Sequence, residues 1–133
     1  MTKDHRIVVI HDETLDRTSN GSGWVKDYTY AELEAFNFNN HDPLVACAKI
    51  PLMEEVFDLI KPTNLIINIE LKTGIVFYKG IEEAIIRMTR EKQMEQRVIY
   101  SSFNHHSILK IQQLDPQAKT AFLYADGPIG MPQ

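Results

Sequence analysis

A histidine, a carboxylate and a lysine stand where strands of this sequence are predicted to end. His11 is followed by Asp12, and one residue separates Glu70 from Lys72. In parallel α/β folds, functional groups gather at the carboxyl ends of the strands. An imidazole moves protons near neutral pH, a carboxylate suits a hard cation such as Mg²⁺ or Ca²⁺, and a lysine stabilises phosphoryl charge. Together these side chains favour hydrolysis of a phosphate ester.

Each of these side chains also has a purely structural interpretation. His11 and Asp12 could form a turn at the end of a strand. Glu70 and Lys72 could form an ion pair on one face, which stabilises little when it is exposed. A metal site would be credible with two carboxylates from different strands, and the sequence offers one good candidate, Glu70.

Two further pairs of polar residues are weaker candidates for a functional site. His105 and His106 are more typical of a solvated helix start than of a metal site, because no third ligand follows at fixed spacing. Ser101 and Ser102 lack the strand–turn–helix glycine context of a nucleophile elbow.

The strand predicted over residues 64–72 organises the chain. Its side chains alternate between faces, so one face is aliphatic (Leu65, Ile67, Ile69 and Leu71) and the other carries Asn68, Glu70 and Lys72. Helical patterns flank this strand, so we expect helices to cover the aliphatic face. The polar face is then expected to look into a cleft or a barrel mouth.

Strands alternate with helices along the sequence. We predict strands over 6–12, 64–72, 98–103 and 120–124, and helices over 30–36, 51–61, 78–93 and from about Asn104 to Leu114. Thr29 and Glu32 have the spacing of a capping box. This order predicts βαβ units, a parallel sheet and the α/β class. A (β/α)₈ barrel would use such units in succession but takes about 250 residues, roughly twice this chain.

Composition limits the class of protein. The 133 residues predict one domain, and a net charge of −4 excludes the basic footprint of a nucleic-acid binder. The single cysteine, Cys47, excludes an intrachain disulfide and is expected to pack in the interior. We find no transmembrane run and no signal peptide, which predicts a cytoplasmic protein.

Four segments of the sequence resemble the glycerophosphodiester phosphodiesterase family. The first, over 8–21, contains His-Asp-x-x-Leu-x-Arg-Thr-x-x-Gly, and the third, over 67–72, contains Glu-x-Lys. The other two lie over 50–56 and 99–103. They follow the family's order at plausible spacing and cover nearly the whole chain.

The resemblance implies a fold, a reaction and roles for four residues. The fold is a (β/α)₈ barrel with a small insertion, here about 13–50. The reaction is metal-dependent hydrolysis of glycerophosphodiesters to glycerol 3-phosphate and an alcohol. His11 resembles the second of two acid–base histidines, and Glu70 resembles the last of three carboxylates that hold Ca²⁺ or Mg²⁺. Lys72 resembles the lysine that faces the phosphate, and Phe103 resembles part of the wall of the substrate pocket.

The sequence also departs from the family pattern. The family begins with strands that carry His-Arg-Gly and Glu-x-Asp, and neither motif occurs here. We therefore expect one partial barrel domain over 1–133, an internal fragment that is inactive or nearly so without its parent enzyme. Leu52 stands where the family often has Thr, so the helix there is expected to begin less firmly.

Two alternatives remain. A truncated half-barrel could serve as a binding or regulatory fragment that associates with itself through open strand edges. A related lipid phosphodiesterase would keep the enzyme class and change the substrate.

Overall fold

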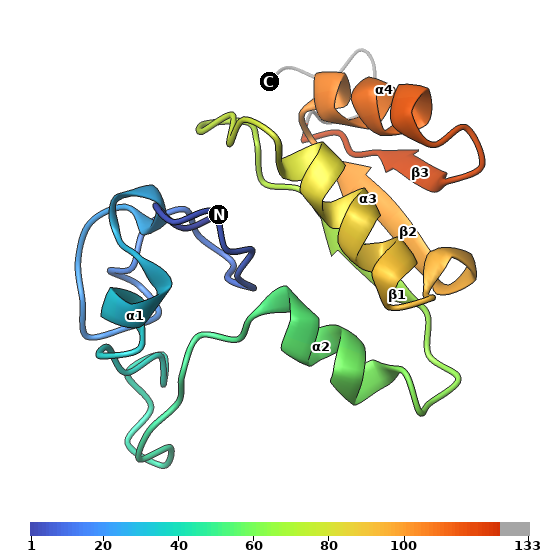
Figure 1. The fold of residues 1–133 in the computed structure, drawn as a ribbon. Coiled ribbons are helices and arrows are strands. Elements are labelled where there is room, and N and C mark those ends of the chain that lie inside the picture. The colour runs from blue at the N-terminus through green and yellow to red at the C-terminus, as the bar shows by residue number, and fades with distance from the viewer. Residues whose placement is uncertain (126–133) are drawn as a thin grey trace. The chain divides into compact units, whose positions relative to one another are not determined.

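A computed structural model describes residues 1–125 of the chain. The chain divides into two compact units, Met1–Thr63 and Asn64–Gln133 (Figure 1). Each unit has its own secondary structure, and the boundary falls in the turn before the strand predicted over 64–72.

The N-terminal unit is built from short helices and loops around a small apolar core. Its elements are η1 (Val25–Asp27), α1 (Tyr30–Leu33) and α2 (Met53–Ile60). The core consists of four side chains that are at most 1% exposed: Leu15, Val25, Leu33 and Ile50. These residues come from loop, 3₁₀-helix and α-helix, so this core is not formed between layers of regular structure.

In both α-helices of this unit, the glutamate at the third position reaches back to the N-cap residue. At α1, Thr29 Oγ1 accepts from Glu32 N while the Glu32 carboxylate accepts from Thr29 N, which confirms the predicted capping box. At α2, the Glu55 carboxylate accepts from Leu52 N at 2.9 Å. The Leu52 side chain has no oxygen that could accept a hydrogen bond in return, so α2 has only one of the two hydrogen bonds of a capping box.

The strand predicted over residues 6–12 is wrong. Val8 makes an isolated antiparallel bridge with Leu52, and the backbone bends from residue 11 to residue 13. Ile7 is buried, and its carbonyl accepts from Met53 N at 2.9 Å. The β-branched run thus packs against the entry to α2 instead of joining a sheet. β-branched residues favour strands because their side chains fit a half-buried surface. This segment provides such a surface, although no parallel strand lies beside it in its unit.

The second unit is a three-stranded parallel sheet with two α-helices. Its strands are β1 (Ile67–Glu70), β2 (Val98–Ser102) and β3 (Lys119–Phe122), in the order β1-β2-β3. The connections carry α3 (Ile81–Glu91) with η2 (Glu95–Arg97), and α4 (His105–Leu114). The predicted βαβ units and parallel sheet are therefore confirmed, with each strand shorter than expected.

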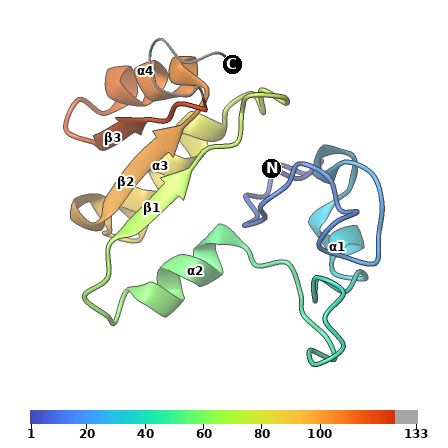
Figure 2. The ribbon, with the colours of Figure 1, turned by 180° about the vertical axis from the view of Figure 1, so that it is seen from behind.

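Helix α3 covers one face of this sheet. It lies in front of the strands in Figure 1 and behind them in Figure 2. Ile81, Ile85 and Ile86 are buried along one side of α3, as its predicted amphipathic pattern requires. The Tyr100 hydroxyl of β2 donates to Thr89 Oγ1 of α3 at 2.8 Å, which joins the two elements through a buried polar contact.

Candidate functional site

The face of β1 that carries polar side chains points away from the helix-covered side. Exposure alternates along the strand, with Ile67 and Ile69 half-buried and Asn68 and Glu70 exposed. The Ser101 hydroxyl of β2 donates to Asn68 Oδ1 at 2.8 Å. The predicted separation of the two faces is confirmed within β1. It does not extend to Leu65, which is exposed before the strand begins.

Glu70 and Lys72 form an ion pair at the carboxyl end of β1. Glu70 Oε2 lies 3.3 Å from Lys72 Nζ, and each side chain is one-third exposed. The ion pair considered as a structural alternative is therefore present. A partly exposed pair of this kind stabilises the fold little, and both groups remain open to solvent for a further ligand.

Hydrogen bonds hold the backbone on both sides of Lys72. On one side, the buried Leu71 receives a bond at its carbonyl from Ser102 Oγ at 2.6 Å. On the other side, the buried Thr73 shares a 2.6 Å contact between its hydroxyl and that of Ser107 in α4. Asn104 Nδ2 donates to the Thr73 carbonyl at 2.9 Å. Lys72 thus projects from a segment that these hydrogen bonds hold, and Ser102 has a structural role.

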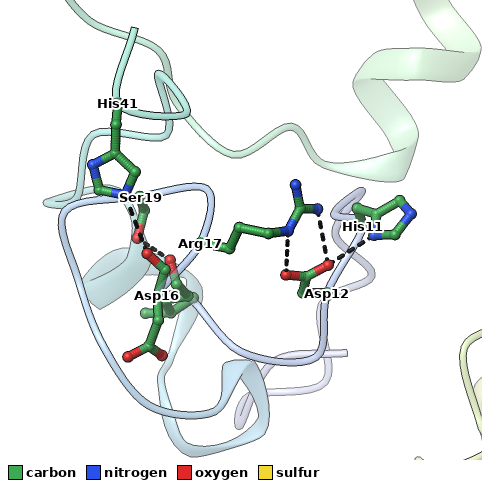
Figure 3. A network of polar contacts seen from close by, with 7 residues as sticks. His11, Asp12, Asp16, Arg17, Ser19 and His41 are labelled. Carbon is green, nitrogen blue, oxygen red and sulfur yellow. Dashed lines mark hydrogen bonds and ion pairs between the residues drawn. The ribbon is translucent and has the colours of Figure 1, made fainter.

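His11 lies in the bent segment of the N-terminal unit and contacts the next side chain. Its Nδ1 is 2.7 Å from Asp12 Oδ1, and the Arg17 guanidinium donates to both carboxylate oxygens, at 2.8 and 3.0 Å (Figure 3). Hydrogen bonds from Arg17, and secondly from His11, hold the pKa of Asp12 far below its usual range. Arg17 was not among the predicted site residues, although its place in the His-Asp-x-x-Leu-x-Arg run was a signal that could have found it.

The region around the start of α4 differs from expectation at one histidine. His105 Nε2 lies 2.9 Å from the Leu123 carbonyl, and the ring makes edge contacts with Phe122 and Tyr124, each with centroids 4.9 Å apart. The prediction of a solvated position is therefore wrong for His105, because β3 returns beside this helix. Phe103 follows β2 directly and is 51% exposed, so its ring is available to a ligand.

The described residues do not complete a metal site. Within residues 1–125, no group of three or more His, Cys, Asp and Glu side chains could hold a metal ion. Glu70 faces the ammonium of Lys72, while Ca²⁺ takes six to eight oxygen ligands and Mg²⁺ six. Cys47 is exposed, so its predicted packing role is wrong. Glu70 and His11 belong to different units.

Comparison with known protein families shows which family the chain matches. Residues 1–131 match the model of the glycerophosphoryl diester phosphodiesterase family. The chain belongs to this family. It is similar to a glycerophosphodiester phosphodiesterase of Caldanaerobacter subterraneus subsp. tengcongensis, with 45% identity over 96% of this chain and 53% of that protein. A glycerophosphodiester phosphodiesterase of Bacillus altitudinis is 44% identical over 95% of this chain and 52% of that protein.

The comparison with solved structures concerns the fold. The crystal structure of glycerophosphodiester phosphodiesterase from Agrobacterium tumefaciens covers 90% of this chain, with a TM-score of 0.74 and 23% identity. This chain matches 49% of that structure and spans about half the length of the curated relatives. The predicted partial (β/α)₈ barrel of the α/β class is confirmed. No helix within residues 1–125 is long and apolar enough to cross a membrane.

Proposed function

We propose that this chain contributes to metal-dependent hydrolysis of glycerophosphodiesters to glycerol 3-phosphate and an alcohol. The observation that carries the proposal is the Glu70–Lys72 pair at the carboxyl end of a parallel strand, in a chain that belongs to the glycerophosphoryl diester phosphodiesterase family. In barrels of this type, reacting groups come from the carboxyl ends of several strands. The activity is that of the whole enzyme, and 1–133 is one partial barrel domain of it.

The residues of this chain would divide the work in the following way. A water oxygen bonds to phosphorus, the bond from phosphorus to the alcohol oxygen breaks, and the alcohol leaves with a proton. His11 would move a proton at the attacking or the leaving oxygen. Lys72 would neutralise charge on the phosphoryl oxygens, and Phe103 would line the pocket.

A divalent cation, Ca²⁺ or Mg²⁺, is the proposed cofactor, with Glu70 as one of its ligands. The described residues of this chain do not fit a complete site, because no three or more of their His, Cys, Asp and Glu side chains form a group that could hold a metal ion. Hydrolysis is therefore assigned to the whole enzyme, and the chain alone is expected to be nearly inactive. We place the enzyme in the cytoplasm, a reducing compartment in which a free, exposed thiol such as that of Cys47 stays reduced.

The test compares the 133-residue chain with a chimera. In the chimera, the parts of the Caldanaerobacter protein that lie outside the match flank this chain. Release of glycerol 3-phosphate from a panel of glycerophosphodiesters with added Mg²⁺ or Ca²⁺ is measured for both. We expect turnover in the chimera and nearly none in the chain, and equal turnover in the two would contradict the proposal.

The matched control examines His11 in the same assay. His11→Ala in the chimera should lower kcat by at least 10²-fold, the usual contribution of one acid–base group. His106→Ala should leave kcat unchanged, because His106 is an exposed residue of α4 that the proposal does not use. Full activity of the His11 variant would remove His11 from the mechanism.

The open edges of the sheet favour a second candidate, a fragment that binds a further strand. Within residues 1–125, β1 and β3 each pair with β2 alone. Unpaired edges are templates for another chain. The partner would be a second copy of this chain, and its test concerns the oligomeric state.

A further inference from the structure

The contacts around Asp12 determine which nitrogen of His11 carries a proton. Asp12 Oδ2 accepts from Arg17 Nε, and Asp12 Oδ1 accepts from Arg17 Nη2 while lying 2.7 Å from His11 Nδ1 (Figure 3). An ionised carboxylate has no proton to donate, so the hydrogen of the His11–Asp12 contact belongs to Nδ1. In the neutral imidazole, Nε2 then carries the lone pair.

Arg17 holds Asp12 in a two-pronged contact that further favours the ionised carboxylate. The guanidinium hydrogen bonds are the largest cause that keeps the pKa of Asp12 far below its usual range, with the bond from His11 second. The same contact raises the pKa of Arg17. Across the pH range in which enzymes work, the carboxylate therefore presents an acceptor to His11 and never a donor.

The loop that carries these side chains is anchored before any ligand arrives. Leu15 is fully buried in the core of the unit, and its carbonyl accepts from both the backbone N and the hydroxyl of Ser19, at 3.0 and 2.8 Å. This turn presents Arg17 toward Asp12. The contact between His11 and Asp12 also requires the bend at residues 11–13. In a strand, consecutive side chains point to opposite faces, so these two could not meet.

His11 itself is open to solvent on its other side. Its side chain is 74% exposed, whereas that of Asp12 is 24% exposed. The carboxylate is therefore the inner partner and the imidazole the outer one. Nε2 can reach a substrate while Nδ1 remains bound, which is the division of tasks that an acid–base histidine needs.

We propose that Asp12 and Arg17 are positioning residues for His11: Arg17 orients Asp12, and Asp12 holds the imidazole as the Nδ1–H tautomer with Nε2 directed to the reacting oxygen. The part of this inference that concerns turnover rests on the proposed function. The part that concerns the tautomer rests on the chain alone.

The tautomer is measured in the 133-residue chain by ¹H–¹⁵N long-range correlation of its histidines at pH 8. We expect the Nδ1–H form to predominate at His11 and the Nε2–H form to predominate at His106, which is exposed. A predominant Nε2–H form at His11 in the unsubstituted chain overturns the proposal. This measurement needs no variant, so it decides the question even if a substitution prevents folding.

Substitutions then test the chain of contacts. Asp12→Ala should return His11 to the tautomer ratio of His106. Arg17→Met should reduce the Nδ1–H population and raise the pKa of Asp12 toward its ordinary value, read from the carboxyl ¹³C shift. Lys26→Met is the matched control, because it breaks another exposed ion pair of the same unit, 2.9 Å to Asp27, and should change neither quantity. An unchanged tautomer ratio in Asp12→Ala overturns the proposal.

Kinetics in the chimera separate positioning from simple structural support. Asp12→Ala should lower kcat by on the order of 10- to 100-fold with KM nearly unchanged, and adding it to His11→Ala should cost nothing further. Undiminished kcat in Asp12→Ala overturns the positioning role. Activity retained by His11→Ala would instead refute the proposed role of His11, and the tautomer measurement would still stand by itself.

Discussion

Glu82 is a buried acid at the start of α3 with few partners. Its side chain is 9% exposed, and Oε1 lies 3.9 Å from Lys110 Nζ. The described structure offers Oε2 no hydrogen-bond donor. Lys110 makes its closer contact, 2.7 Å, with Glu83. Desolvation by burial raises the pKa of Glu82 above its ordinary value.

This raised pKa gives stability a definite pH dependence. The folded state binds the proton of Glu82 more tightly than the unfolded state does. The contribution of Glu82 to stability is therefore fully present below the unfolded pKa, about 4.3, and is lost as pH rises through the folded pKa. At neutral pH the buried carboxylate is a net cost.

Glu82→Met should consequently stabilise the chain at pH 7. Methionine has a similar length and a good helix propensity, and it removes an unsatisfied buried oxygen that costs about 1–3 kcal/mol. We expect the free energy of unfolding in urea to rise by about 1 kcal/mol at pH 7 and by less at pH 4. Glu83→Met, on the exposed neighbour, should change it by less than about 0.5 kcal/mol. A larger gain at pH 4 than at pH 7 would contradict this account.

Helix α4 is joined to the sheet through its N-cap residue, Asn104. The Asn104 side chain accepts from His106 N as an N-cap and donates to the Thr73 carbonyl beyond β1, while its backbone N donates to Ser102 Oγ at the end of β2. One residue thus joins the ends of two strands to a helix start. Asn104 therefore also holds the segment that carries Lys72.

Asn104→Ala should therefore cost more than the loss of an ordinary cap. Removing a cap costs about 1 kcal/mol, and leaving the Thr73 carbonyl without its donor adds about 1–3 kcal/mol. We expect a loss of about 2 kcal/mol or more, measured by urea unfolding followed at the amide signals of β2. Asn104→Asp should lose less, because it keeps the cap. Thr29→Ala, at the capping box of α1, should cost about 1 kcal/mol in its own unit. Equal losses for Asn104→Ala and Thr29→Ala would refute the additional role.

Within residues 1–125, the parallel sheet has a strand at each edge that pairs on one side only. The sheet of residues 64–125 ends at β1 on one side and β3 on the other. Ile66, just before β1, is 62% exposed. Apolar residues at an unpaired edge favour pairing with a second chain, and natural sheets often place lysine there to prevent it.

Ile66→Lys should therefore weaken association of the chain with itself. Burying one isoleucine contributes roughly 1.5–3 kcal/mol, so the dissociation constant should rise about ten-fold or more. Sedimentation velocity over a range of concentrations measures it. Leu109→Lys is the control, because Leu109 is an apolar residue of α4 that is 48% exposed and does not belong to a strand. A monomer at every concentration would exclude edge pairing.

Local patterns in the sequence were enough for most of the second unit. Alternation along residues 67–70 separated the polar face of β1 from its half-buried face. Helical periodicity located α3, and the order of the elements determined a parallel sheet. These features were predictable because periodicity along a short segment already fixes which side chains share a face. The motifs around His11 and Glu70 were enough to indicate the family.

Only the tertiary structure decided what those side chains contact. The run of residues 6–12 has the composition of a strand, yet its partner is Leu52 and the chain bends at His11. The bend brings His11 and Asp12 together, and a turn anchored by buried Leu15 brings Arg17 to them. The bridge between Val8 and Leu52 and the core around Leu15 join segments distant in sequence, which local propensity does not encode. The sequence by itself therefore determined the fold class, the family and the candidate residues, and the tertiary structure determined how His11 and Lys72 are held.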